Sequence, residues 1–171
     1  MMMARPIAPD DAATLRSITV GMGQFALARC NEHLRTLGLG SCIAVIIFAP
    51  RQQLAALAHC MLPTADQADG SPAKFVQTAV PTLLTQLEAS GGSVPFAAAL
   101  VGGASRFPGV PTEFMRDIAG QNIAAARDAL AAAAVPIRHE DVGGQVGRSV
   151  LVDPATQRVM VHTIRGGDRW L

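Results

Sequence analysis

The residues best suited to chemistry begin at Cys42, which follows the stretch TLGLGS and opens the apolar run CIAVIIF. The reactive form of a cysteine is the thiolate, which requires a nearby base or cation at neutral pH. Attack on a carbonyl carbon also requires backbone N–H groups that hold the resulting oxyanion. Gly38, Gly40 and Ser41 suit this second need, because glycines allow sharp turns and close approach of a substrate. The stretch indicates a nucleophilic cysteine, with Gly40 and Ser41 as candidate oxyanion or substrate-binding residues.

Among the four histidines of the chain, His59 is the best candidate for the base. It lies near the end of the apolar segment LAALAHCML, which comes after CIAVIIF and a short connection. If these two segments form a hairpin, the start of the first lies beside the end of the second, and Cys42 and His59 become neighbours. A triad-like arrangement also needs a group that orients the imidazole. Thr36, on the segment that leads to Cys42, is the nearest polar candidate.

Other interpretations of the same residues stay open. A cysteine ahead of an apolar strand is commonly a small buried hydrophobe. Zinc is a chemical alternative, because Cys30 and His33 have CxxH spacing and Cys42, His59 and Cys60 could add ligands. Structural zinc sites, however, present paired ligands on short knuckles, and adjacent residues of a strand point to opposite faces. We therefore expect no metal site.

The glycine-rich stretch is not typical of a phosphate-binding loop. GLGSC lacks the P-loop lysine and is followed by a predicted strand, not by a helix whose N-terminus would hold a phosphate. We therefore expect no cofactor.

Composition limits the classes of function. Of the 171 residues, 50% are hydrophobic and 16% are charged, which favours a packed domain. The net charge of +1 creates no field that would attract nucleic acid or anionic lipid. Three cysteines, an odd number, favour a reduced compartment. Because the longest aliphatic stretch is far shorter than the roughly 20 residues that span a bilayer, we expect a cytoplasmic protein without nucleic-acid binding or membrane insertion.

The elements that must position these residues can be predicted from pattern. We expect residues 1–16 to be a flexible lead-in and residues 17–171 to be a single domain. Two helices are expected, one beginning at Pro72 after a Ser71 cap, kinked at Pro81 and ending at Ser90, and one over residues 122–135. Strands are expected over 17–29 with a break at Gly21 and Gly23, and over 33–39, 42–48, 54–62, 96–101, 137–142, 148–153 and 158–164. Because strands cluster at both ends of this order, we predict an α+β fold with layered sheets.

Several motifs together resemble the CheD family of chemoreceptor glutamine deamidases. They are, in order, TLGLGSCIAV, AHCMLP, SPAKF, LVGGAS and EDVGGQVGRSV. The resemblance runs from about Ile18 to about Val161, nearly the whole chain. GLGSC followed by H-x-MLP is its most specific part.

The resemblance implies a cysteine hydrolase that converts glutamine side chains of methyl-accepting chemotaxis receptors to glutamate, through a cysteine thioester. It places the nucleophile at Cys42, the histidine at His59 and the triad threonine at Thr36. It also implies a layered α/β sandwich of mixed sheets with outer helices, related to toxin-type cysteine deamidases. The partners it implies are the receptors and a CheC-type phosphatase.

The chain departs from the family pattern at a few positions. Cys60 stands where the family often has Ile or Val after the histidine. Asp117-Ile118-Ala119-Gly120-Gln121-Asn122 stands where the family often reads N-I-G-x-R-N before the second helix. The absent glycine and arginine affect the expected loop geometry and any partner contact through Gln121.

Further residues have two interpretations each. Gly102 and Gly103 are candidates for lining the site, or else they turn the chain after a buried strand. Gly143-Gly144 and Arg148 have the same two interpretations, and Phe107 is a candidate anchor for a protein partner.

Two other functions fit the sequence. One is a non-catalytic interaction protein that binds chemoreceptors or a CheC-type phosphatase. The other is a cysteine hydrolase that acts on a different amide or ester.

Overall fold

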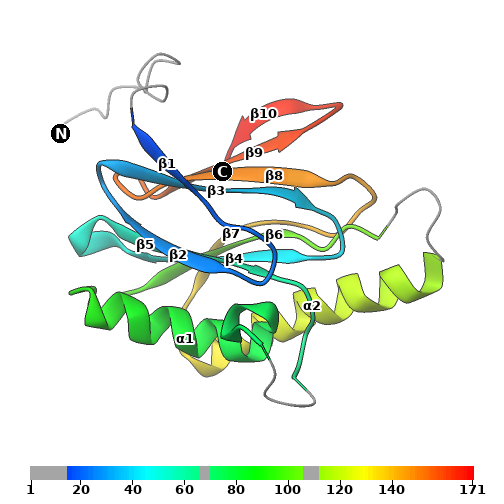
Figure 1. The fold of residues 1–171 in the computed structure, drawn as a ribbon, viewed down its shortest axis with the longest axis horizontal. Coiled ribbons are helices and arrows are strands. Elements are labelled where there is room, and N and C mark those ends of the chain that lie inside the picture. The colour runs from blue at the N-terminus through cyan, green and yellow to red at the C-terminus, as the bar shows by residue number, and fades with distance from the viewer. Residues whose placement is uncertain (1–14, 66–69, 106–111) are drawn as a thin grey trace.

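The fold has three layers, in which two β-sheets pack face to face and two helices cover the outer face of the second sheet (Figure 1). The computed structural model describes residues 15–65, 70–105 and 112–171. Each sheet has five strands and contains both parallel and antiparallel pairs. The predicted α+β class, with layered mixed sheets and outer helices, is confirmed.

The first sheet contains strands from both ends of the chain. Its order is β1 (Arg16–Thr19), β3 (Glu32–Leu39), β8 (Arg148–Asp153), β9 (Arg158–Thr163) and β10 (Gly167–Trp170). The order of the second sheet is β2 (Phe25–Arg29), β5 (Leu54–Cys60), β4 (Ile43–Ala49), β6 (Ala97–Gly102) and β7 (Ile137–Val142). The break predicted at Gly21 and Gly23 therefore lies where the chain passes from the first sheet to the second.

Strands β4 and β5 form the predicted hairpin at the centre of the molecule. They pair antiparallel from Ile43↔Cys60 to Ala49↔Leu54, and every residue of both strands is buried. One face of the hairpin meets the first sheet and the other meets the helices. Because both faces are covered, both strands are continuous apolar runs, which is why LAALAHC shows no alternation in sequence. A short 3-10 helix, η2 (Pro50–Gln52), connects them.

The helices α1 (Val76–Ala89) and α2 (Thr112–Ala132) pack on the second sheet. Leu83, Leu87 and Leu130 are fully buried there, against β4 and β5 residues such as Ile47. Helix α1 continues past Pro81 to Ala89.

Two expected helix starts were wrong, and one strand was missed. Ser71 caps the 3-10 helix η3 (Pro72–Lys74), and α1 begins only at Val76. Helix α2 begins at Thr112, ten residues before the expected start at position 122, so Gly120 lies within it. A glycine inside a helix costs about 1 kcal/mol. Packing of neighbouring residues such as buried Ala119 compensates this cost. Strand β10 was missed because Gly167–Trp170 has only one apolar residue, but it pairs with β9 across a tight turn.

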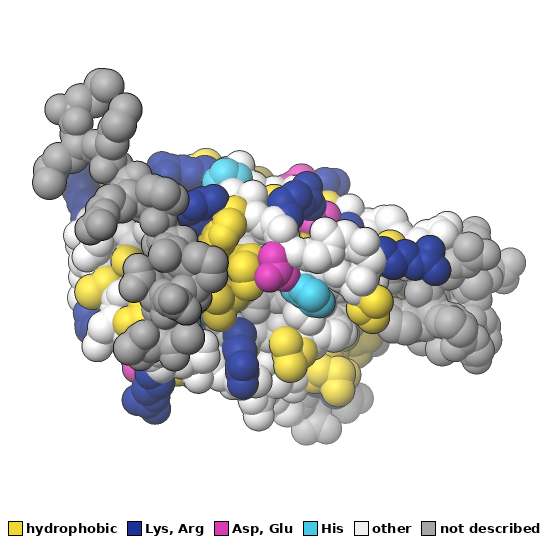
Figure 2. Space-filling view, turned by 90° about the horizontal axis from the view of Figure 1, so that it is seen from above, with side chains coloured by type: hydrophobic (Ala, Val, Ile, Leu, Met, Phe, Trp, Pro, Cys, Tyr) yellow, Lys and Arg dark blue, Asp and Glu magenta, His cyan; other side chains and the backbone are white. Residues whose placement is uncertain are grey.

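The surface over the first sheet carries mixed charge. In Figure 2, Lys and Arg side chains are dispersed among acidic, apolar and neutral ones on this face. This dispersal agrees with the near balance of 14 basic and 13 acidic residues in the sequence. Among the described residues, no helix is long and apolar enough to cross a membrane.

Candidate functional site

The β4–β5 hairpin brings Cys42 and His59 together. His59 is paired directly with Ala44, and Cys42 lies two residues before Ala44. Residues two apart on a strand share a face, and diagonal neighbours across a pair lie within reach of long side chains. Cys42 and Ala44 both pack on the core between the sheets. The thiol and the imidazole therefore share the inner face at one end of the hairpin.

Thr36 reaches His59 from the other sheet. The Thr36 hydroxyl donates to the carbonyl oxygen of Val20 at 2.6 Å, and its oxygen lies 2.7 Å from His59 Nδ1. A hydroxyl has one proton, and this one is given to Val20, so the Thr36 oxygen accepts from His59 Nδ1–H. This assigns the tautomer of a neutral His59: Nδ1 carries the proton, and Nε2 has a free lone pair. Nε2 is buried and has no hydrogen-bond partner among the described residues.

Backbone contacts fix the position of His59 as well. Its N–H donates to the carbonyl of Gln24 at 3.0 Å, and its carbonyl accepts from Gly23 N–H at 2.9 Å. Gly23 has a φ of +69°, which a non-glycine residue adopts only with strain. These two backbone hydrogen bonds connect the turn between β1 and β2 to His59.

Burial favours the neutral forms of both reactive groups. It raises the pKa of the Cys42 thiol above its ordinary value, and a hydrogen bond from the backbone N–H of Cys42 partly offsets the rise. Burial also lowers the pKa of His59 below its ordinary value. The resting pair is therefore a thiol and a neutral imidazole, since an ion pair would place two charges in a poorly solvated site.

The glycine-rich stretch contains a β-bulge. Thr36 pairs with Val150 and Leu39 pairs with Arg148, so Leu37 and Gly38 together oppose the single residue Ser149. Gly38 has a φ of +69° and donates its N–H to the Ser149 hydroxyl at 3.3 Å. Bulges bend a strand and redirect the chain beyond the bend. The bend at Gly38 thus lies between the threonine and the cysteine and sets the path from one to the other.

The nucleophile segment, Gly40 to Cys42, is held by hydrogen bonds to its three consecutive carbonyl oxygens. That of Gly40 accepts from Ala104 N–H at 2.7 Å, and that of Cys42 accepts from Gly103 N–H at 2.8 Å. The carbonyl of Ser41 accepts from the side-chain amide of Asn122 at 2.9 Å. Because these bonds exist before any substrate arrives, the backbone around Cys42 is preorganised.

Gly102 and Gly103 lie against the backbone of Cys42. Gly102 has a φ of +118°, and a Cβ there would collide with the Cys42 carbonyl oxygen. Gly103 has a φ of +66°, and a Cβ there would meet Ile123 of α2. The absence of a side chain at Gly102 thus allows β6 to approach the nucleophile segment, and its absence at Gly103 allows α2 to approach the end of β6. Both glycines support the site through backbone contacts.

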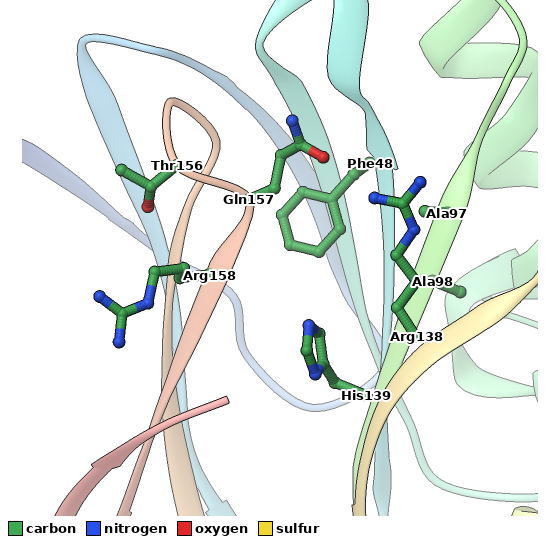
Figure 3. Close-up of a pocket in the computed structure, with 8 residues that line it drawn as sticks. All are labelled: Phe48, Ala97, Ala98, Arg138, His139, Thr156, Gln157 and Arg158. Carbon is green, nitrogen blue, oxygen red and sulfur yellow. The ribbon is translucent and has the colours of Figure 1, made fainter. Parts of the chain in front are cut away.

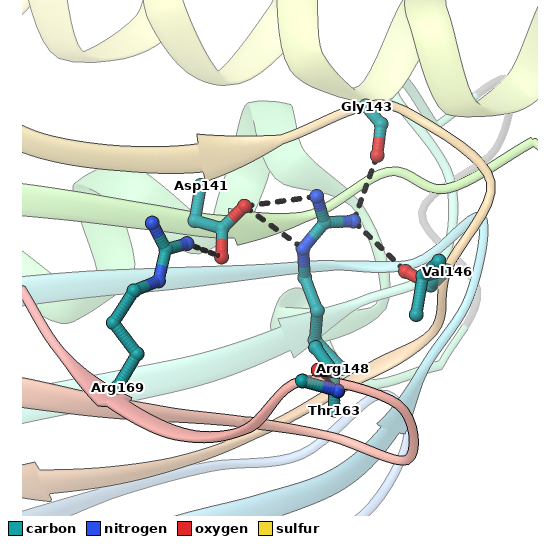
Figure 4. Close-up of polar contacts among 7 residues, drawn as sticks. Asp141, Gly143, Val146, Arg148, Thr163 and Arg169 are labelled. Atoms are coloured by element: carbon teal, nitrogen blue, oxygen red, sulfur yellow. Dashed lines mark hydrogen bonds and ion pairs between the residues drawn. The ribbon is translucent and has the colours of Figure 1, made fainter.

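A partly buried ion pair holds the neighbouring loop. Arg148 donates to Asp141 Oδ1 through Nε at 3.0 Å and Nη2 at 2.9 Å, and through Nη1 to the carbonyls of Gly143 at 2.7 Å and Val146 at 3.0 Å (Figure 4). Asp141 also binds Arg169 of β10. This network joins β7 of one sheet to β8 and β10 of the other. Gly143 N–H in turn donates to Gly102 O at 2.9 Å, which connects the loop to the site.

Replacing Arg148 by lysine tests this network. An ammonium group cannot serve the carboxylate and two carbonyls in the fork geometry of a guanidinium. We expect Arg148→Lys to lower the free energy of unfolding by about 1–3 kcal/mol, because polar partners lose their bonds in a region where the Arg148 side chain is only 10% exposed. Urea denaturation measures this.

Arg127→Lys is the matched control for that measurement. Arg127 also makes a two-pronged bond, to Glu140, but its side chain is 51% exposed. An exposed pair contributes roughly 0–1 kcal/mol. Equal destabilisation by the two variants would contradict a special role for Arg148.

The remaining candidates lie apart from the thiol–imidazole pair. Cys60 points to the helix side of the second sheet, where its pKa is raised by burial and by the neighbouring Cys42. His59 and Cys60 thus face opposite sides of β5, as expected from the pattern, and the described residues contain no group of three or more side chains suited to a metal. Phe107 lies outside the described residues. The segment 117–122, expected as a loop, lies within α2.

A cavity of about 220 Å³ lies between the sheets at the other end of β4 (Figure 3). It is lined by Phe48, Ala97, Ala98, Arg138, His139, Thr156, Gln157 and Arg158. None of the candidate reactive residues reaches it, so we assign the chemistry to the Cys42 end.

Asn122 of α2 is a further residue of the site, which sequence reasoning missed. It is fully buried and touches the segments on which both Cys42 and His59 lie. Two signals pointed to it: it is a single asparagine in an alanine-rich helix, and it matches the last position of the family pattern N-I-G-x-R-N. The expected start of the second helix at position 122 was too late to show which face Asn122 occupies.

Comparison with known proteins gives one consistent family. The sequence model of the family described as "CheD chemotactic sensory transduction" matches residues 61–163. A protein of Desulforamulus reducens named "Probable chemoreceptor glutamine deamidase CheD" is 34% identical over 86% of this chain and 90% of its own length.

Two further relatives bear the name "Chemoreceptor glutamine deamidase CheD". That of Halalkalibacterium halodurans is 34% identical over 89% of this chain and 96% of its own length. That of Bacillus subtilis is 32% identical over 89% of this chain and 94% of its own length. Alignments that cover this share of the chain extend across the segment from Thr36 to His59.

Proposed function

The chain belongs to the CheD family, and on that premise we propose that it is a glutamine deamidase of methyl-accepting chemotaxis receptors, with Cys42, His59 and Thr36 as its catalytic triad. One observation carries the proposal. The bond from Val20 through Thr36 to His59 leaves a basic Nε2 on the strand face that also holds Cys42. A partly buried thiol beside a neutral, oriented base is an arrangement suited to general-base-assisted nucleophilic attack.

In the proposed reaction, His59 Nε2 takes the Cys42 proton as Sγ attacks the carboxamide carbon of a receptor glutamine. Backbone N–H groups near Ser41 and Cys42 hold the oxyanion. The C–N bond breaks, and His59 returns the proton to the departing ammonia. Water then attacks the thioester with His59 as base, which leaves glutamate and the free thiol. Gly40, Gly102 and Gly103 act in this scheme by keeping the nucleophile segment in place and accessible.

The depressed pKa of His59 predicts the pH dependence. The imidazole must be neutral to act as base, so kcat/KM should rise with pH and reach half its plateau below about 6.5, the ordinary histidine value. The raised pKa of Cys42 means that the thiol stays protonated across neutral pH. We therefore expect a plateau from about pH 7 to above 8, with a normal solvent deuterium isotope effect. A bell-shaped profile centred near neutrality, with no isotope effect, would indicate a preformed thiolate–imidazolium pair and contradict this prediction.

The function is tested by incubating the full chain with a cytoplasmic fragment of a chemotaxis receptor. Peptide mass mapping should show conversion of specific glutamines to glutamates, with release of an equal amount of ammonia. Receptor glutamines that stay intact under all conditions would refute the proposal. Conversion of free glutamine or of unrelated proteins at the same rate would indicate a less specific amidohydrolase.

Other parts of the proposal rest on the family resemblance. A CheC-type phosphatase is proposed as a second partner, and co-purification of the two proteins tests this. A receptor substrate also implies that the protein works in the cytoplasm. We further propose that the layered sandwich is related to that of toxin-type cysteine deamidases.

A further inference from the structure

We propose that Asn122 is a positioning residue for the reaction, and that it sets the spacing between the segment that carries the nucleophile and the segment that carries the base. The inference rests on the function proposed above for Cys42 and His59. It arises from a fully buried amide on α2 that spans two separate backbone segments.

The amide group of Asn122 bridges the ends of β4 and β5. Its Nδ2 donates to Ser41 O at 2.9 Å and to Met61 O at 3.1 Å. Ser41 immediately precedes the nucleophile, and Met61 lies two residues after His59. Both partners are carbonyls, so only the NH₂ end of the amide can face them, and its orientation is fixed by chemistry.

This bridge lies just beyond the last pair of the hairpin ladder. The β4–β5 pairing ends at Ile43↔Cys60, and Met61 N–H then turns away to donate to Lys74 O at 2.9 Å. The pairing does not continue toward Ser41 and Met61. The two N–H donors of Asn122 hold these segments together where the backbone ladder has stopped.

The other end of the amide is costly for stability. Asn122 Oδ1 is buried and has no hydrogen-bond partner among the described residues. Burial of an unpaired acceptor is unfavourable, and an apolar residue in the alanine-rich helix would avoid it. An apolar residue at position 122 would lack the two hydrogen bonds that Asn122 donates, and both of these bonds go to segments that carry site residues. This favours a role in site geometry over a role in packing.

The carbonyls on either side of that of Ser41 are bound by backbone groups and not by a side chain. Those of Gly40 and Cys42 are bound by backbone N–H groups of Ala104 and Gly103, which no side-chain substitution removes. The Ser41 contact is the one that depends on a side chain. Asn122 is therefore the point at which a single substitution loosens the nucleophile segment without altering Cys42, His59 or Thr36.

The test compares alkylation of Cys42 with alkylation of Cys30 by iodoacetamide, with peptide mass spectrometry as the readout. Cys30 is exposed and serves as an internal reference within each molecule. We expect Asn122→Ala to lower the Cys42:Cys30 rate ratio about tenfold, since small misplacements of reacting groups cost up to about 100-fold in rate. In deamidation, kcat should fall about tenfold, with KM changed less than twofold. Asn122→Ser retains one donor and should give intermediate values if Asn122→Ala does not fold.

Leu130→Ala is the control for a merely structural effect. Leu130 is fully buried on the same helix, about two turns beyond Asn122, and packs in the core between the helices and the second sheet. It should lower the melting temperature and leave the alkylation ratio unchanged. An unchanged ratio in the Asn122 variants, or an equal fall in Leu130→Ala, would overturn the proposal.

A double substitution tests the link to the base. If Asn122 acts by positioning Cys42 against His59, Asn122→Ala should add little to the loss of Cys42 reactivity already caused by His59→Ala. Full additivity would overturn the proposal. Because alkylation needs no receptor, these results stand even if deamidation is not observed, and the two proposals fail separately.

Discussion

Cys42→Ala should abolish receptor deamidation, with kcat at least about 1,000-fold below that of the unmodified protein. Removing Sγ removes the atom that forms the covalent intermediate, and neither His59 nor Thr36 can replace it. Cys42 is only partly buried, and its segment is held by backbone carbonyls, so the variant should keep the fold. Conversion of receptor glutamines is measured by peptide mass mapping, and folding by circular dichroism and thermal melting.

The other two cysteines provide matched controls. Cys30→Ala alters an exposed thiol outside the site and should leave deamidation within about twofold. Cys60→Val replaces a buried thiol on the helix side of β5 with an apolar residue that suits a strand, and kcat should likewise be retained. Undiminished deamidation by Cys42→Ala, or an equal loss in Cys30→Ala, would rule out Cys42 as the nucleophile.

The site was predictable from sequence where it depends on local pairing. Cys42 and His59 lie at the open end of one hairpin, and a short connection between two apolar runs is enough to predict such a neighbourhood. Thr36 was also placed near them because it leads directly into Cys42. These predictions needed no knowledge of how the sheets stack.

The features that the sequence did not reveal depend on contacts between distant segments. The acceptor for the Thr36 hydroxyl is Val20 O, which faces Thr36 only because β1 pairs in parallel with β3. Asn122 meets Ser41 and Met61 because α2 crosses the end of the second sheet. Residue spacing carries no information on such contacts, since each depends on how whole elements pack.

The glycines of the site were likewise only partly predictable. A glycine before a strand indicates a turn, and the glycines before Cys42 also indicated that a substrate could approach the backbone N–H groups there. The structure shows two different uses: Gly38 forms a bulge in β3, and Gly102 lets β6 approach the Cys42 carbonyl. Both shape the backbone on which the thiol is presented.

Thr36→Val should lower kcat about 100-fold while KM changes little. Valine has nearly the shape of threonine but no hydroxyl, so the variant removes the acceptor of His59 Nδ1–H and leaves Val20 O unpaired. Without that acceptor, the imidazole can rotate or shift its proton to Nε2, and the tautomer with a free Nε2 is no longer favoured. A base with the wrong tautomer or orientation cannot take the Cys42 proton, although receptor binding is unaffected.

Two measurements separate this effect from a general loss of stability. Thr36→Ser keeps the hydroxyl and should retain most of kcat, although it removes a methyl group from the core. Nitrogen-15 NMR of the His59 ring should report a proton on Nδ1 in the unmodified protein and in Thr36→Ser, and a shift toward Nε2–H in Thr36→Val. If Thr36→Val kept both full kcat and the Nδ1–H tautomer, the threonine would be a packing residue, and the functional unit would reduce to Cys42 and His59.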